Sequence, residues 1–350
     1  MRSPLQSIRF RPIGARSVCC DRAAVVILML LLAASTVAAC NIPVFRYALE
    51  RWKPDPCEIL VFHNQDFDES QQAVVDQIRR RTIGPDQGSQ NGHANAKLSV
   101  VDLRDNADSK QREIWDDLRQ NTEASLPQVL VRTRLGRGQF INHWHGSLAS
   151  LTDQKVLQSP ARDEIRDRLL SGHSVVWLLI RSSDQTKNAN AKRLAENTFR
   201  TLQSKIQLPE GIGLPGSELY ADVPLILKFS LLEIDPDDKN ELFLAGLLTG
   251  LRKQPFDEGE PLFVPVFGRG RALEVIPAND MSARLMEDLT AYLSGACSCQ
   301  VKEQNPGFDL LIEADWDTQL FGHDGAQPPD RSAEEGRQRN PTLVPIPPGR

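Results

Sequence analysis

LPQVLVRTRLGRG, at residues 126–138, recurs in pattern as EPLFVPVFGRG at residues 260–270. Each stretch places a proline before a short apolar run, and a Gly-Arg-Gly turn and a second run of strand type follow. Two apolar runs around a glycine turn are typical of a β-hairpin. The recurrence therefore predicts two copies of one domain, each with a hairpin that has a proline at its mouth.

The residues around the first hairpin predict the rest of that domain. Residues 57–63 are a short apolar run of buried-strand type, residues 68–80 carry apolar side chains on one helical face, and residues 97–103 read as a second strand. A helix over 110–120 precedes the hairpin and a short helix near 151–157 follows it. The order β-α-β-α-β-β-α predicts two parallel strands completed by an antiparallel hairpin, in a four-stranded sheet flanked by helices.

The second half of the chain repeats this order. The expected strands and helices are, in turn, 175–180, 189–206, 225–234, 240–249, the hairpin 262–276 and 281–293. One residue fits badly, because Pro265 falls inside a strand that should be central and has no N–H to donate. We therefore expect a β-bulge at Pro265 or a displaced strand boundary.

The amino-terminal segment has the layout of a secretory signal. A basic stretch ends at Arg22, an apolar run covers residues 23–34, and small residues follow at 35–39. The apolar run is shorter than the roughly 20 residues that a membrane-spanning helix needs. An uncleaved anchor is the alternative if the run is extended through Ala39. We expect residues 1–39 to be a signal peptide and the protein to be exported, in the periplasm or associated with the envelope.

Cleavage after Ala39 would make Cys40 the first mature residue. Residues 37–40, VAAC, resemble a bacterial lipobox with valine in place of the usual leucine, which raises the alternative of a lipoprotein anchored through Cys40. Residues 41–52 are rich in large apolar side chains that favour burial over a free tether. A soluble exported protein is therefore the preferred interpretation, with membrane contact only through a lipid on Cys40 as the alternative.

Composition limits the function classes. The chain is 40% hydrophobic and 25% charged, as in globular proteins. Its formal charge is -5, and removal of residues 1–39, with five arginines and one aspartate, leaves about -9. Phosphate binding rests on clustered Lys and Arg, so we expect no nucleic-acid partner.

These patterns divide the chain into six segments. We expect a signal peptide at 1–39, an apolar segment packed on the body at 40–56, one domain at 57–160, a second at 161–296, a C-terminal extension at 297–325 and a disordered tail at 326–350.

The element order and the proline before each hairpin resemble the thioredoxin fold, in which that proline is typically cis and faces the redox motif. Pro127 and Pro261 match its position. Where the family places Cys-x-x-Cys, this sequence has NQDF at 64–67 and SSDQ at 182–185. The resemblance implies an α/β protein with two thioredoxin-like domains in tandem, each with sheet order 2-1-3-4. It also implies no redox activity, because the thiolate nucleophile is missing.

A second resemblance concerns the start of the expected mature chain. CNIPVFRYALERW, at residues 40–52, is similar to the opening of an uncharacterised group of exported planctomycete proteins. It implies export and no particular activity.

Four cysteines remain after the signal peptide: Cys40, Cys57, Cys297 and Cys299. In an oxidising compartment they suggest two disulfides, with three connectivities open. One interpretation is a staple that joins Cys40 or Cys57 to Cys297 or Cys299. The other is a redox or Cu(I) site at the Cys-Ser-Cys pair. We prefer the staple, because the pair follows a closing helix and lies away from both prolines.

Three histidines are candidate metal ligands. His143 and His145 are two apart on an expected strand, so their rings should project from one face, and His63 ends the first strand at what should be the same sheet edge. Such imidazoles could hold Zn or Cu with a further ligand. We prefer surface and partly packed rings as the interpretation and expect no cofactor.

The sequence thus favours an exported, non-catalytic binding protein of the cell envelope that uses thioredoxin-like domains to bind another envelope protein. The alternative is a thiol-disulfide or copper-handling protein that uses Cys297 and Cys299. A structural scaffold without an exchanging ligand is a third interpretation.

Overall fold

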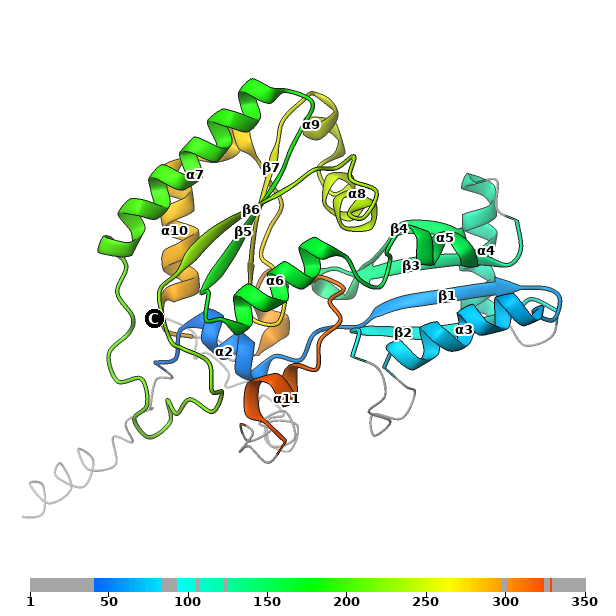
Figure 1. The fold of residues 1–350 in the computed structure, drawn as a ribbon, viewed down its shortest axis with the longest axis horizontal. Coiled ribbons are helices and arrows are strands. Elements are labelled where there is room, and N and C mark those ends of the chain that lie inside the picture. Colours follow the sequence, from blue (N-terminus) through cyan, green and yellow to red (C-terminus); the bar gives the residue numbers. More distant parts are fainter. Residues whose placement is uncertain are drawn as a thin grey trace, which may run out of the picture. The chain divides into compact units, whose positions relative to one another are not determined.

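The computed structural model describes residues 41–83, 93–104, 108–122, 125–297, 301–323 and 328. The expected signal peptide, Cys40, Cys299 and the expected tail apart from Pro328 lie outside these residues. The described residues form two β-sheets with helices on both faces (Figure 1). Among them, no helix combines the length and the apolar character needed to cross a membrane.

The first sheet has the strand order β2-β1-β3-β4. Strands β1 and β2 are parallel, and β3 is antiparallel to both β1 and β4. This is the predicted order 2-1-3-4. The elements are β1 (Cys57–His63), α3 (Glu69–Arg81), β2 (Ala96–Asp102), α4 (Ser109–Asn121), β3 (Gln128–Arg134), the 3₁₀ turn η1 (Gly136–Gly138), β4 (Phe140–Ser147) and α5 (Leu148–Asp153).

Strand β1 divides the first domain into two packed layers. Ile59 and Val61 belong to the core shared with α3 and α5, and Leu60 and Phe62 belong to the core shared with α4. This alternation follows from the two-residue period of a strand. Helix α3 begins where Asp68 accepts a hydrogen bond from the Gln71 N–H, at 2.8 Å, in a capping box.

The second sheet repeats the topology. Its order is β6-β5-β7-β8-β10, so β6-β5-β7-β8 is again 2-1-3-4, with β5 and β6 parallel. Two thioredoxin-like domains therefore lie in tandem. The elements are α6 (Pro160–Leu170), β5 (Val175–Ile180), α7 (Gln185–Lys205), β6 (Phe229–Ile234), α8 (Leu242–Gly250), α9 (Lys253–Asp257), β7 (Leu262–Phe267), β8 (Arg271–Ala272), β9 (Ile276–Pro277), the 3₁₀ turn η2 (Ala278–Asp280), α10 (Ala283–Ser294), the 3₁₀ turn η3 (Lys302–Gln304) and β10 (Phe308–Asp309).

Strand β5 is buried along its whole length, as a continuous apolar run predicts. Trp177 and Leu179 face the core shared with α7 and α10, and Leu178 and Ile180 face the core shared with α6 and α8. Figure 1 shows these two helix pairs on opposite faces of the sheet.

Pro265 lies inside β7, opposite Trp177 of β5, and the register there is continuous. Its carbonyl accepts from the Leu273 N–H at 2.9 Å, so its polar side faces the outer strand rather than β5. The outer strand is split there into β8 and β9. The register between β7 and the outer strand shifts by one residue across this gap, since Val266 pairs with Ala272 while Phe263 pairs with Ile276. The irregularity expected at Pro265 therefore lies in the outer strand, and the strand boundary predicted for β7 is not displaced.

The apolar segment after residue 40 forms the buried helix α2 (Val44–Arg51). Tyr47 and Ala48 pack in the core of the second domain that also holds α7 and α10. Arg46 pairs with Glu50 at 2.8 Å, and Arg46 also donates to the Val223 carbonyl at 2.8 Å. These bonds satisfy the charged groups that the helix buries.

The C-terminal segment contacts both domains. Strand β10 pairs with β8 of the second sheet, while Glu313 forms a bridge with Ala94, next to β2 of the first. Asn95 is central, because its side chain donates to the carbonyl of Leu310 and accepts from the N–H of Ile312. Helix α11 (Trp316–Phe321) then packs against the second domain.

Candidate functional site

The loop after β1 and the start of β3 enclose a pocket of about 150 Å³. We call it the first mouth. Pro127 contributes one side, and the Leu126–Pro127 peptide bond is the only cis bond found in the described residues. The structure thus brings Pro127 together with the segment that replaces the redox motif. The lining residues are His63, Asn64, Gln65, Asp66, Phe67, Gln71, Leu126 and Pro127.

Charged side chains order the rim of the first mouth. Arg104 donates to Asp66 at 2.8 Å and to Asp102 at 2.7 Å. The hydrogen bonds from Arg104 lower the pKa of the Asp102 carboxyl to about 2, so this carboxylate stays charged at neutral pH. His63 Nδ1 lies 2.9 Å from the Gln65 carbonyl, and its ring lies 4.5 Å from that of Phe67. The rim is thus polar and the pocket has an aromatic side chain.

The main chain at Leu126 is open. The ladder between β1 and β3 begins at Phe62 and Gln128. No hydrogen bond from the N–H or C=O of Leu126 to a described residue is formed. Leu126 is only half-buried. A backbone donor and acceptor next to a pocket can bind an extended segment in the manner of an added strand.

The equivalent loops of the second domain are tied to each other. Ser182 Oγ donates to the Gly259 carbonyl at 2.7 Å, and Lys187 forms an ion pair with Glu260. Asp184 caps α7 through the N–H groups of Thr186 and Lys187. Pro261 follows Glu260 directly, and its carbonyl accepts from Ala278 at 2.8 Å. The main chain before the proline, which is open at Leu126 in the first mouth, is engaged here, because the Glu260 N–H donates to the Pro255 carbonyl at 3.0 Å.

The structure does not bring the three candidate histidines together. His63 ends β1, while His143 and His145 lie on β4, two strands away across β3. A β-bulge falls at His143, because Val131 pairs with Trp144 while Arg132 pairs with Asn142. Strict alternation was therefore the wrong premise for placing His143 and His145 on one face. No group of three or more metal-ligating side chains occurs in the described part of the chain.

Two of the four candidate cysteines are described, and they lie in different cores. Cys57 starts β1, is 1% exposed, and its Sγ lies 3.4 Å from Thr133 Oγ1. Burial raises the pKa of the Cys57 thiol to about 11, and this thiol forms no disulfide with a described residue. Cys297 is 2% exposed in the core beside α2. Connectivities that use Cys40 or Cys299 lie outside the described residues and stay predictions.

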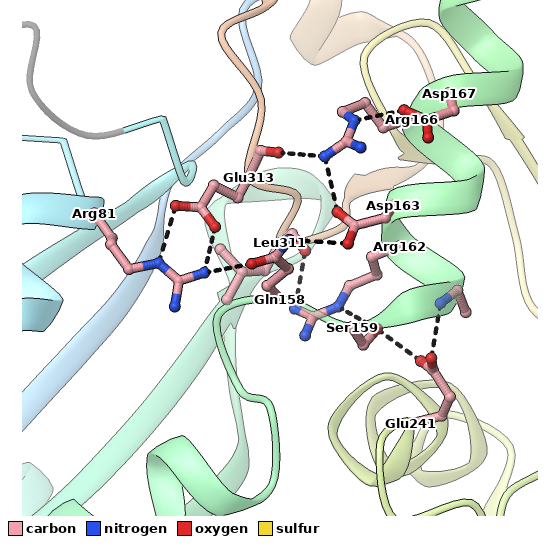
Figure 2. Close-up of polar contacts among 11 residues, drawn as sticks. Arg81, Gln158, Ser159, Arg162, Asp163, Arg166, Asp167, Glu241, Leu311 and Glu313 are labelled. Atoms are coloured by element: carbon pink, nitrogen blue, oxygen red, sulfur yellow. Dashed lines mark hydrogen bonds and ion pairs between the residues drawn. The ribbon is translucent and has the colours of Figure 1, made fainter.

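A buried polar junction joins the domains, and the sequence pattern did not reveal it. Arg162, in the first turn of α6, donates to the carbonyls of Val156 and Leu311 at 2.9 and 3.1 Å and to Ser159 Oγ at 3.0 Å. Burial lowers the pKa of Arg162 to about 10. Glu241 accepts from Ser159 Oγ at 2.7 Å (Figure 2). The only local signal was Ser159 followed by proline, a common helix start.

A cavity of about 430 Å³ lies beside this junction. Lys155 and Asp163 line it together with the amides of Gln77, Gln158 and Asn240. Asp163 is already engaged by Arg166 at 2.8 Å and by Gln158 at 2.9 Å. The lining mixes both charge signs, so it defines no single ligand chemistry.

Comparisons with known proteins add little to this geometry. No protein-family model and no curated protein matches the sequence, so the resemblance of residues 40–52 to exported planctomycete proteins stays a prediction. Among solved structures, the chain is similar to full-length ERdj5, with a TM-score of 0.21, 10% identity and coverage of 77% of this chain. The chain spans 34% of the length of ERdj5.

A second similar structure is the NTD_N/C domain of the alkylhydroperoxide reductase AhpF from Enterococcus faecalis. Its TM-score is 0.17 and its identity 8%, over 70% of this chain and 94% of that one. Likenesses this remote carry no argument about function. The assignment of the fold rests on the strand order of the two sheets.

Proposed function

We propose that the protein is an exported, non-catalytic binding protein of the cell envelope whose first mouth binds an extended segment of another envelope protein. One observation carries this proposal: a pocket of about 150 Å³ adjoins Leu126, whose main-chain N–H and C=O bond to no described residue. Export rests on the signal-like layout of residues 1–39.

The bound segment would lie beside Leu126 as an added strand. Main-chain hydrogen bonds of this kind supply affinity that depends little on sequence, and a flanking pocket supplies specificity. The pocket next to Pro127 has room for one side chain, in contact with Phe67 and the amides of Asn64 and Gln65. Asp66, which is 91% exposed beside Arg104, would offer the partner a carboxylate at the rim.

The residues at the mouth support the proposal that it carries out no thiol chemistry. Asn64 and Phe67 stand where thiol chemistry would require cysteines. Cys57, the cysteine of this domain, begins β1, whereas the mouth lies at the other end of that strand, about 20 Å away for seven residues. Its raised pKa keeps the thiol protonated at neutral pH.

The second domain would support the first rather than bind the same ligand. Its corresponding loops are closed by Ser182 and Gly259 and by Lys187 and Glu260. Opening them for a strand would break these bonds, which makes binding there unfavourable.

Site-specific photo-cross-linking in the native host tests the proposal. A photo-reactive residue replaces exposed Gln65 of the first mouth, and a matched control places it at exposed Ser183 of the second domain. We expect a cross-link from position 65 to one extended segment of an envelope protein, located by peptide mapping, and no such product from position 183. Equal yields at both positions, or no product at position 65, would reject the first mouth as the binding site.

A further inference from the structure

The first described residues, from Asn41 onward, are held against the body by hydrogen bonds and burial. The Asn41 N–H donates to Ser217 Oγ at 3.0 Å. Ile42 is 1% exposed, and Pro43 forms a bridge with Ala296. Asn41, the residue that follows Cys40 in the sequence, is therefore tied to this surface.

An apolar turn lies at this point of entry. Residues 208–217, LPEGIGLPGS, contain one ionisable side chain, Glu210. The turn is closed by hydrogen bonds from Gly213 N–H to the Ser217 carbonyl and from Ser217 N–H to the Leu214 carbonyl, both 2.8 Å. Leu214 at its tip is 61% exposed, more than any other large hydrophobic residue that the structure describes.

The turn and the start of the chain touch each other. Gly211 has a φ of +83°, and a Cβ at Gly211 would lie 2.8 Å from the side-chain Nδ2 of Asn41. The positive φ favours glycine at this position, and the Asn41 side chain lies directly against it. The most exposed apolar side chain of the described surface therefore lies next to the residue that follows Cys40.

A single exposed leucine needs no explanation in a soluble protein. The position of Leu214 is nevertheless informative, because it lies beside Asn41 and residues 37–40 resemble a lipobox. Acyl chains on Cys40 would insert into a bilayer and draw the adjacent surface against it. An apolar turn at that surface can enter the boundary between head groups and acyl chains, and this second contact fixes how an anchored protein is oriented.

We propose that residues 211–216 form a membrane-contacting turn that lies in the interfacial layer of the bilayer when the chain is anchored through a lipid on Cys40. The partner is the lipid surface itself. Glu210 is acidic and no basic side chain occurs in the turn, so the contact is hydrophobic and does not depend on anionic lipids. The second domain, into which α2 packs, then lies next to the membrane.

The test uses the full chain, processed in a host that acylates lipoproteins and transferred to phosphatidylcholine vesicles. An environment-sensitive fluorophore is attached at Leu214→Cys or, as a matched control, at Leu242→Cys, which is 38% exposed at the start of α8. Labelling of the parent protein measures the contribution of the native cysteines. We expect a diacylglyceryl mass on the peptide that begins at Cys40, a blue shift and quenching by spin-labelled lipids at position 214, and neither effect at position 242.

Several outcomes would overturn the proposal. Unmodified Cys40 in protein from the native envelope removes the anchor on which it rests. The turn is rejected as the membrane contact if the emission at position 214 is the same with and without vesicles. Equal shifts at positions 214 and 242 would reject it as well. As a second variant, Leu214→Asp should abolish quenching of a fluorophore at position 212 while the acyl mass and the thermal midpoint stay unchanged, since Leu214 is exposed. Partner binding at the first mouth is measured separately, so its failure is distinguishable.

Discussion

The imidazole of His143 lies against the ring of Phe243, with the ring centroids 4.9 Å apart, where β4 of the first domain meets α8 of the second. The Arg162 guanidinium carbon lies 5.0 Å from the centroid of the same Phe243 ring. Both His143 ring nitrogens are buried and lack a well-aligned hydrogen bond, and the main chain of Ile141 offers the ring only a weak interaction. This contact favours a neutral imidazole, because burial and the nearby Arg162 cation disfavour a charged ring more than the Ile141 main chain stabilises it.

Acid should therefore destabilise the protein through His143. Burial lowers the pKa of His143 to about 4, from 6.5 in an exposed chain. Between these values the unfolded chain binds the proton and the folded chain does not, so the free energy of unfolding falls as the pH drops from 6.5 to 4. The free energy of unfolding falls by at most about 1.4 kcal/mol per pH unit in this range, and the total loss approaches about 3 kcal/mol. Urea unfolding across this range should show a shallower pH dependence for His143→Leu.

A matched control for this titration is His145→Leu, since His145 is exposed on the same strand. This variant keeps the contact between His143 and Phe243 and should therefore keep the acid loss that this contact causes. Burial also lowers the pKa of His173 to about 4, so part of the acid loss should remain in His143→Leu. A pH dependence that His143→Leu leaves unaltered would contradict the neutral contact.

Arg162 should be required for joining the two domains. Its guanidinium donates hydrogen bonds to the buried carbonyls of Val156 and Leu311 and to the Ser159 hydroxyl, and all three are lost when the side chain is removed. Arg162→Ala should lower the free energy of unfolding by about 3 kcal/mol. The control is Arg284→Ala, whose side chain is 79% exposed in an ion pair with Asp288, and it should cost less than about 0.5 kcal/mol. Similar losses in the two variants would show that the junction adds little.

Asn95 should hold the C-terminal segment to the first domain. Its amide donates to the carbonyls of Asp55 and Leu310, both at 3.0 Å, and accepts from the Ile312 N–H at 2.7 Å. Asn95→Ala should speed hydrogen exchange of the Ile312 amide at least about tenfold, because opening of that segment then breaks fewer bonds. The exposed Asn121→Ala on α4 is the control and should leave that exchange unchanged. Unaltered protection at Ile312 in Asn95→Ala would contradict this role.

The protein should not reduce disulfides. With dithiothreitol as electron donor, insulin reduction should proceed at the rate without added protein, since the first mouth has no thiol and the Cys57 thiol has a pKa near 11. Thioredoxin serves as the positive control. Turnover at a comparable rate would refute a non-catalytic first mouth.

The hairpins made the fold predictable, because a proline, an apolar run and a glycine turn are local features that each copy carries. The place of Pro127 beside residues 64–67 followed from the resemblance to the thioredoxin fold, in which this proline faces the redox motif. Helix α6 was not predicted, since Arg162 occupies a buried position that an amphipathic pattern reserves for apolar residues. The bulge at His143 was also hidden, as its ring packs on Phe243, about 100 residues later. Asn95 joins segments that share no local pattern.

The dissociation constant of the segment identified by cross-linking, measured as a synthetic peptide, tests the central claim most directly. Titrations compare the wild type with Gln65→Arg in the first mouth and Ser183→Arg in the second domain, both exposed positions whose variants should keep the wild-type thermal midpoint. The proposed function predicts that Gln65→Arg weakens binding at least about tenfold, or 1.4 kcal/mol, and that Ser183→Arg leaves it within about twofold. Equal affinity for the wild type and Gln65→Arg would contradict binding at the first mouth.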